Sequence, residues 1–251
     1  MTFKTFAGEH PYLSAIWFLL VVVCIVLGIG ALNVYFLVGS LVQVAIVDGL
    51  LAISGIILLT RLGWWDRAGY TSWIRWRDLP LFILPVAVAL LSFSEGISVT
   101  APLTLLSFAA LTFVVGFAEE TFFRGLILTT LIPAGTVRAV IVSSFFFAAP
   151  HLLNSIGGIW DPAFTVVDSI AAFGLGVTFA ALRLRTGSIW PLVGVHALFD
   201  FTSLVAIGSV VVHAQSVQTL ASSVVIGFVF VLYGLFLIRG SKNPDNLPVE
   251  K

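Results

Sequence analysis

Eight apolar runs follow one another along this chain, and they constrain its fold more than any other feature of the sequence. The runs cover residues 12–32, 34–60, 80–93, 102–118, 137–153, 163–182, 189–212 and 220–238. A helix crosses a bilayer with about 17 to 25 apolar residues; only the third run is shorter, and the fourth can be extended past an acidic pair to residue 132. Because 59% of the residues are hydrophobic and 10% are charged, a water-soluble globule could not bury this apolar surface. The sequence predicts an all-α, polytopic membrane protein, a bundle of about eight transmembrane helices.

The placement of the basic residues tests this count independently. If the N-terminus is cytoplasmic, the cytoplasmic segments hold all 12 Lys and Arg residues, and the alternate connections hold none. Cytoplasmic loops collect Lys and Arg, so we expect both termini in the cytoplasm and the protein in the cell membrane. The tryptophans and arginines of residues 61–79 predict an interfacial helix among the lipid headgroups.

We expect one membrane domain over residues 1–251. Two N-terminal spans and an interfacial loop (1–78) precede a core (79–203), and the last span and a cytoplasmic tail (204–251) follow it. The formal net charge is zero, which argues against a nucleic-acid partner because such partners require a basic surface. Membrane lipid is the expected partner.

Two carboxylates and a guanidinium interrupt the fourth span. An ionisable group inside a span costs on the order of 3 kcal/mol, so each one requires an explanation. Glu120 and Arg124 are four residues apart and share a helix face, so they can pair, whereas Glu119 points about 100° away and stays free. The alternative is a helix end whose charges snorkel to the cytoplasmic interface.

Two histidines occupy later spans. His151 follows Pro150, which should kink its helix, and Phe147 lies one turn earlier. His196 and Asp200 are one turn apart, and a carboxylate at that spacing can fix an imidazole tautomer. The alternatives are a histidine at the outer membrane edge and a polar pair that joins two helices.

Helix depth suggests that these groups meet. At about 1.5 Å of rise per residue, Glu119, His151 and His196 can all lie at mid-depth, toward the cytoplasmic half. Such a set can hydrolyse an amide with Glu119 as general base on a water and two imidazoles donating to the oxyanion. It can equally hold a zinc ion whose bound water loses a proton readily. The residue types leave both open, so the cofactor is either none or one divalent metal such as zinc.

Other signals are weaker. The chain has no Gly-x-Ser-x-Gly elbow and no His-Glu-x-x-His helix. Asp48 and Asp168 are lone carboxylates in the second and sixth runs, expected to be packing partners, neutral groups or cavity residues. Four glycines favour close helix contacts: Gly28, Gly30, Gly174 and Gly176.

Three motifs together resemble the CaaX protease and bacteriocin-processing (CPBP, Abi) family of intramembrane endopeptidases. They stand here as Glu119-Glu120-x-x-x-Arg124, Phe147-x-x-x-His151 and His196-x-x-x-Asp200, and a typical Thr-Gly-Ser-Ile-Trp-Pro lead-in covers residues 186–191. Each motif is short, but three in order inside spans are specific together. The resemblance covers roughly residues 79–203 and implies an eight-helix core.

The resemblance also implies an activity and roles. Glu119 would activate the water, His151 and His196 would stabilise the oxyanion or bind a metal, and Asp200 would support them. Arg124 with Glu120 would hold the cytoplasmic mouth of the site. Eukaryotic relatives remove the last three residues of prenylated CaaX proteins, and their third motif ends in Asn where this chain has Asp200. The resemblance as a whole implies that the substrate is a membrane-associated peptide or protein.

Two other classes of function remain open. Buried Asp, Glu and His side chains also serve transporters and proton relays, although no inverted repeat of broken helices is visible. A non-catalytic bacteriocin-immunity or scaffold protein of the same fold is the third reading. Cleavage by the protein and by Glu119→Ala discriminates the protease from both.

Overall fold

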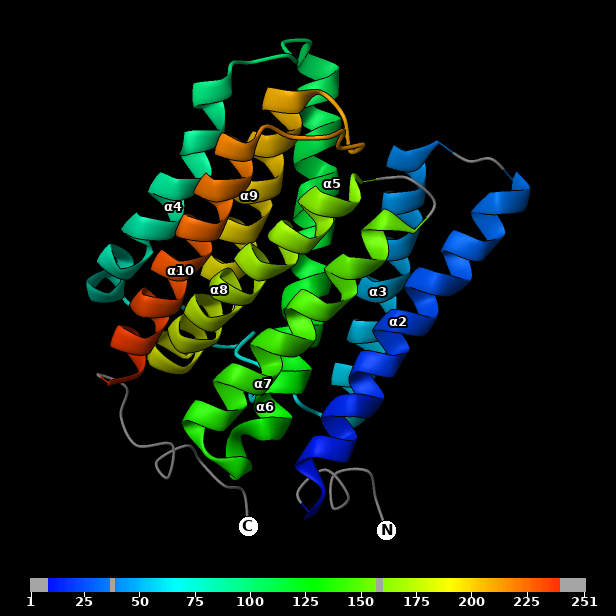
Figure 1. Cartoon of the computed structure of the whole chain (residues 1–251). Coiled ribbons are helices and arrows are strands. Elements are labelled where there is room, and N and C mark those ends of the chain that lie inside the picture. The colour runs from blue at the N-terminus through cyan, green and yellow to red at the C-terminus, as the bar shows by residue number, and fades with distance from the viewer. Residues whose placement is uncertain (1–8, 37–38, 157–159, 240–251) are drawn as a thin grey trace.

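The computed structural model describes residues 9–36, 39–156 and 160–239 of the chain. Its helices run up and down in one bundle, with α2 and α3 on one side and α4 and α10 on the other (Figure 1). The elements are α2 (Pro11–Phe36), α3 (Ser40–Leu62), the 3₁₀-helix η1 (Trp76–Phe82), α4 (Ile83–Leu90), the 3₁₀-helix η2 (Leu91–Glu95), α5 (Pro102–Glu120), the π-helix η3 (Thr121–Ile127), α6 (Leu128–Leu131), the 3₁₀-helix η4 (Ile132–Ala134), α7 (Thr136–Ala148), the 3₁₀-helix η5 (Ala149–Ser155), α8 (Pro162–Thr186), α9 (Trp190–Ile207) and α10 (Val217–Arg239).

Among the described residues, eight helical segments are long and apolar enough to cross a membrane, which confirms the predicted fold class. The fourth is Pro102–Ala134, so it continues past the acidic pair. The second begins at Ser40 rather than residue 34 because α2 runs on to Phe36. The seventh ends at Ile207 rather than residue 212, because Gly208 adopts the left-handed conformation that stops a helix.

The segment between the second and third spans does not form the predicted interfacial helix. Gly63 ends α3 in the left-handed conformation, and a second turn passes through Gly69, whose φ is +86°. The Arg183 guanidinium donates to the carbonyls of Arg67 and Ala68 at 2.7 and 3.0 Å. In a helix, these carbonyls would accept from backbone N–H groups four residues further along the chain. Here they accept from Arg183 instead, and the segment forms a turn.

Small residues bring the helices into close contact. A Cβ on Gly174 of α8 would lie 2.1 Å from the carbonyl oxygen of Gly227 on α10, and one on Gly176 would lie 3.0 Å from the Ser144 side chain. These contacts confirm the prediction for α8. The prediction for Gly28 and Gly30 was wrong, because nothing lies within 4 Å of a Cβ at either position.

The positions of the apolar and polar side chains are those expected of a bundle surrounded by lipid. Large apolar side chains of α2, α3 and α10 are exposed on the outside of the bundle, where lipid would meet them. Several charged and hydroxyl side chains are instead buried between the helices, among them Glu120, Arg124 and His196. Polar groups buried in this way need partners within the protein, and those partners define the site.

Candidate active site

Four of the predicted site residues lie on the α-helices α5 and α9, and the other two, Arg124 and His151, lie where regular α-helix is interrupted. Glu119 and Glu120 end α5, and the π-helix η3 begins at the next residue. Seven consecutive residues of η3 are buried, and π-turns of this kind are frequent at functional sites. The α7 helix ends at Ala148 and tightens into the 3₁₀-helix η5, which carries Pro150 and His151. The kink expected at Pro150 is therefore a change of helix type.

Glu120 is the centre of the buried contacts. Its Oε1 accepts from Arg124 Nη1 and contacts His196 Nδ1, each at 2.8 Å. The Glu120 side chain is 0% exposed and that of Arg124 is 1% exposed. The predicted pair is thus present, but it is enclosed within the bundle rather than placed at a mouth. A buried carboxylate that bonds one ring nitrogen fixes the orientation of the imidazole.

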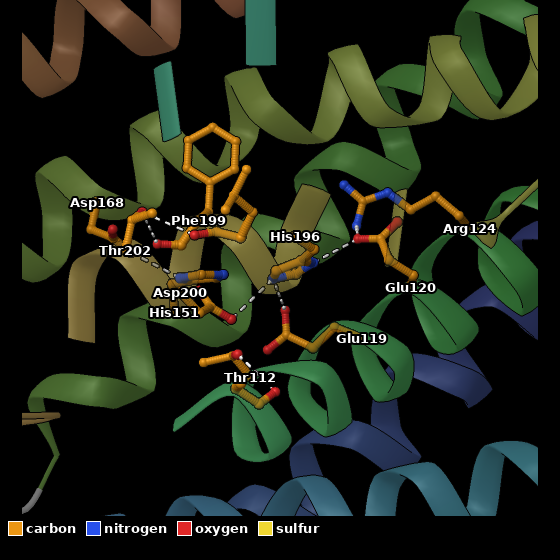
Figure 2. A network of polar contacts seen from close by, with 12 residues as sticks. Thr112, Glu119, Glu120, Arg124, His151, Asp168, His196, Phe199, Asp200 and Thr202 are labelled. Atoms are coloured by element: carbon orange, nitrogen blue, oxygen red, sulfur yellow. Dashed lines mark hydrogen bonds and ion pairs between the residues drawn. The ribbon is translucent and has the colours of Figure 1, made fainter. Parts of the chain in front are cut away.

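The other edge of His196 faces two more carboxylates. Nε2 lies 3.6 Å from Glu119 Oε2 and 3.8 Å from Asp200 Oδ2. Both distances exceed a direct hydrogen bond, so Nε2 approaches both carboxylates without a hydrogen bond to either. Asp200 Oδ2 is a buried atom with no hydrogen-bond partner in the described part of the chain. Figure 2 shows Glu119, Glu120 and Asp200 grouped around the His196 ring.

His151 has a carboxylate partner of its own. Its Nδ1 lies 2.8 Å from Asp168 Oδ2, and Asp168 comes from α8. Phe147 contacts both imidazoles, with ring centroids 5.2 Å from His151 and 5.9 Å from His196. Each histidine is therefore held at Nδ1 by a carboxylate from another helix.

Aromatic rings enclose the charged groups. The Arg124 guanidinium lies 4.1 Å from the centroid of Phe147 and 5.3 Å from that of Phe179. Phe179 also meets His196 edge-on at 6.1 Å. Rings over a buried cation stabilise it and exclude water. The guanidinium charge is therefore kept next to Glu120 rather than hydrated.

Side-chain exposure increases from Glu120, which is fully buried, to Glu119 and Asp200. The side chains of Glu119 and Asp200 are 24% and 36% exposed, whereas that of His196 is 7% exposed. The His151 and Asp168 side chains are also partly exposed. A buried layer of charged groups thus lies beneath a more exposed layer of acid and base groups.

The loop between α3 and η1 supports the site from the end of the bundle. Tyr70 bonds the Thr121 hydroxyl at the first turn of η3, and Trp190 Nε1 donates to the Tyr70 carbonyl at 3.0 Å. Burial raises the pKa of the Tyr70 hydroxyl, so it remains available as a donor. The loop therefore connects the starts of η3 and α9, the two segments that carry Arg124 and His196.

The residues considered as zinc ligands do not converge as a metal site. Within the part of the chain that the structure describes, no group of three His, Cys, Asp or Glu side chains is placed to hold a metal ion. Glu119 and His196 are neighbours, but His151 contacts Asp168 and Phe147 instead. The donor types would suit zinc, yet their arrangement does not fit it.

The sequence predicted the residues that meet around His196 but not the partner of His151. Asp168 was recognised as a lone carboxylate in a span, and such residues are functional candidates by default. Its partner could not be named, because η5 and α8 meet only in the folded bundle. Asp48 is a second lone carboxylate of this kind, on the buried face of α3.

The fold and this cluster define a polytopic membrane protein with acidic and basic side chains grouped between its helices. Residues 100–202 match the family described as Type II CAAX prenyl endopeptidase Rce1-like. The match contains all three motifs and Asp168, and it confirms the resemblance noted from the sequence. The chain is therefore similar to CAAX-type intramembrane proteases. Comparison with curated proteins and with solved structures gave no match.

Proposed function

We propose that this protein is an intramembrane endopeptidase that hydrolyses a peptide bond of a membrane-associated substrate with a water activated by Glu119. The observation that carries the proposal is the position of Glu119. It is a partly exposed carboxylate, 3.6 Å from an imidazole that Glu120 fixes from the buried side. This geometry supports a general base beside a positioned hydrogen-bond donor.

The reaction follows from these roles. Glu119 takes a proton from water as the water oxygen bonds to the scissile carbonyl carbon. His196, as an imidazolium, donates from Nδ1 to Glu120 and from Nε2 to the oxyanion, and His151 is the second donor. The C–N bond then breaks, and the proton held by Glu119 passes to the leaving amine. No step needs a redox partner or a further co-reactant.

The remaining predicted residues support this chemistry. Arg124 balances the charge of Glu120 and keeps it in place at 2.8 Å. Asp200 lies at the accessible edge, next to His196 Nε2, where it orients the water or the peptide. The substrate class is a CaaX-like, lipid-anchored or transmembrane peptide, since a soluble peptide would have to leave water to reach side chains between helices.

The orientation is part of the proposal. We place both termini and the opening of the site in the cytoplasm of a cell whose plasma membrane holds the protein. The support is the distribution of Lys and Arg along the chain, because basic residues are retained on the cytoplasmic side. Accessibility of single cysteines placed in alternate loops of a Cys24→Ser chain tests this arrangement.

The decisive experiment uses the full chain in proteoliposomes with a prenylated peptide ending in a CaaX sequence. An unprenylated copy of the same peptide is assayed in parallel, and products are identified by mass spectrometry. Glu119→Gln keeps the shape of the side chain but removes the base, and we expect a loss of about 10²- to 10⁴-fold in kcat. The matched control is Asp78→Asn, an acid-to-amide change in η1, outside the site.

Three results are informative. Cleavage of both peptides would favour a transmembrane or general membrane substrate over recognition of the prenyl group. Cleavage at equal rates by the wild-type protein and Glu119→Gln would contradict the proposal. Activity lost in Asp78→Asn as well as in Glu119→Gln would show that the assay reports folding rather than catalysis.

A further inference from the structure

One buried carboxylate near the site comes from outside the matched region. Asp48 lies on α3, which precedes residues 100–202. It is 6% exposed, and in the described part of the chain its carboxyl makes no hydrogen bond or ion pair. A buried charged or polar group without a partner is costly, so Asp48 requires an explanation that helix packing does not provide.

The packing of α3 places Asp48 beside the end of α5. The buried face of α3 consists of Asp48, Leu51, Gly55, Leu59 and Leu62. A Cβ on Gly55 would lie 2.7 Å from Cγ2 of Thr121, so α3 approaches closely at the residue that follows Glu120. The two helices are neighbours in Figure 1.

The axial positions agree with this placement. Asp48 precedes Gly55 by seven residues, about 10 Å along the helix, whereas Glu119 precedes Thr121 by two residues, about 3 Å. Helical side chains lean toward their own N-termini, and α3 and α5 run in the same direction (Figure 1). The Glu119 side chain therefore extends toward the level of Asp48.

Electrostatic interactions identify the same neighbours. Glu119, Asp200 and His196 are all near enough for their charges to act on the Asp48 carboxyl. Two of these groups surround the space beside His196 Nε2. Asp48 itself belongs to the buried face of α3 that packs against the end of α5.

We propose that Asp48 is a positioning residue that holds, together with Glu119, the water that attacks the substrate. This inference rests on the proposed hydrolytic function. Two carboxyl groups on either side of a water restrict its orientation, and a small misplacement of a reacting group lowers a rate substantially. A site built only from residues 100–202 would lack this second contact.

Kinetics of two substitutions test the proposal in the full chain. Asp48→Asn keeps a hydrogen-bonding side chain, and Asp48→Leu removes it. We expect kcat to fall by about 10- to 100-fold in Asp48→Leu and by less in Asp48→Asn, with KM unchanged in both. The midpoint of thermal unfolding should stay constant or rise, because a buried polar group has been removed. A residue with only a structural role would lower the midpoint instead.

A double-substitution cycle separates this inference from the proposed function. Asp48→Asn and Glu119→Gln are combined, and the three shifts of the unfolding midpoint are compared. If Asp48 and Glu119 share a water, the midpoint shift of the double variant should differ from the sum of the two single shifts by about 2 °C or more. This measurement does not require a substrate. Additive shifts would overturn the placement of Asp48. Normal kcat in Asp48→Leu, in an enzyme that Glu119→Gln inactivates, would overturn its role.

Discussion

The carboxylate of Glu120 lies 2.8 Å from Nδ1 of His196, although the two residues are 76 positions apart in the chain. The same oxygen also accepts from Arg124, and all three side chains are buried. A charge removed from water is tolerated only where its partners compensate for the lost hydration. The orientation of His196 and the stability of the bundle around it therefore depend on one buried oxygen.

Substitution of Glu120 tests how much the buried Glu120–Arg124 ion pair contributes to the stability of the protein. In Glu120→Gln the Arg124 charge stays buried without its counter-charge, and we expect the free energy of unfolding to fall by about 3 to 5 kcal/mol. Thermal unfolding in detergent measures the change. An unfolding midpoint equal to that of the wild-type protein would contradict the buried position of the pair.

The matched double variant removes both charges. Glu120→Leu with Arg124→Met should recover much of the lost stability, since apolar residues of similar volume often replace buried ion pairs without cost. Cleavage should remain absent because His196 has lost its Nδ1 partner. Active double-variant protein would show that Glu120 is not needed to orient the histidine.

Asp168 should matter to catalysis although it lies outside the three motifs. Asp168→Asn weakens the 2.8 Å contact that holds His151, and loss of such an orienting partner typically costs about 10- to 100-fold. We expect the decrease in kcat, with little change in KM, in the proteoliposome cleavage assay. Ser169→Ala, the next position on α8, is the control, and equal activities of the two variants would argue against an orienting role.

The contact between α5 and α9 should be sensitive to one methyl group. A Cβ on Gly116 would lie 2.9 Å from the carbonyl oxygen of Val193 and 3.1 Å from the amide of Ala197. Gly116→Ala should therefore push α9 away, with a loss of about 1 to 3 kcal/mol of stability and a larger proportional loss of kcat. Gly194→Ala is the matched control, because nothing lies within 4 Å of a Cβ there. Similar rates for both variants would contradict this packing.

Metal chelators should leave cleavage unchanged. The side chains considered as ligands are not arranged to hold a metal ion in the described part of the chain, and in the proposed mechanism Glu119 acts on water directly. The measurement is the initial rate of peptide cleavage after dialysis against EDTA and 1,10-phenanthroline, with the metal content of the protein determined in parallel. Activity that disappears and returns with zinc would require a different arrangement of His151.

The span count was predictable because lipid imposes a simple rule on the sequence. Each crossing needs a long apolar run, and apart from Arg124, which lies within the fourth span, the Arg and Lys residues gather at alternate ends of the runs. The structure differs from the predicted helices where local backbone geometry determines where a helix ends or whether one forms. Gly208 ended the seventh helix early, and the Arg183 bonds to the carbonyls of Arg67 and Ala68 replaced the expected interfacial helix with a turn.

By itself, the sequence determined the bilayer as solvent and the number of spans. It also marked the charged side chains inside apolar runs as candidate site residues, because such charges are costly. It also determined the Glu120–Arg124 pair, since residues four apart on a helix are neighbours. Only the tertiary structure decided that Glu120 also contacts His196, that Asp168 contacts His151, and that the buried face of α3, which carries Asp48, packs against the end of α5. Those contacts join different helices, and helical periodicity fixes the direction of a side chain around its own axis but not which helix it meets.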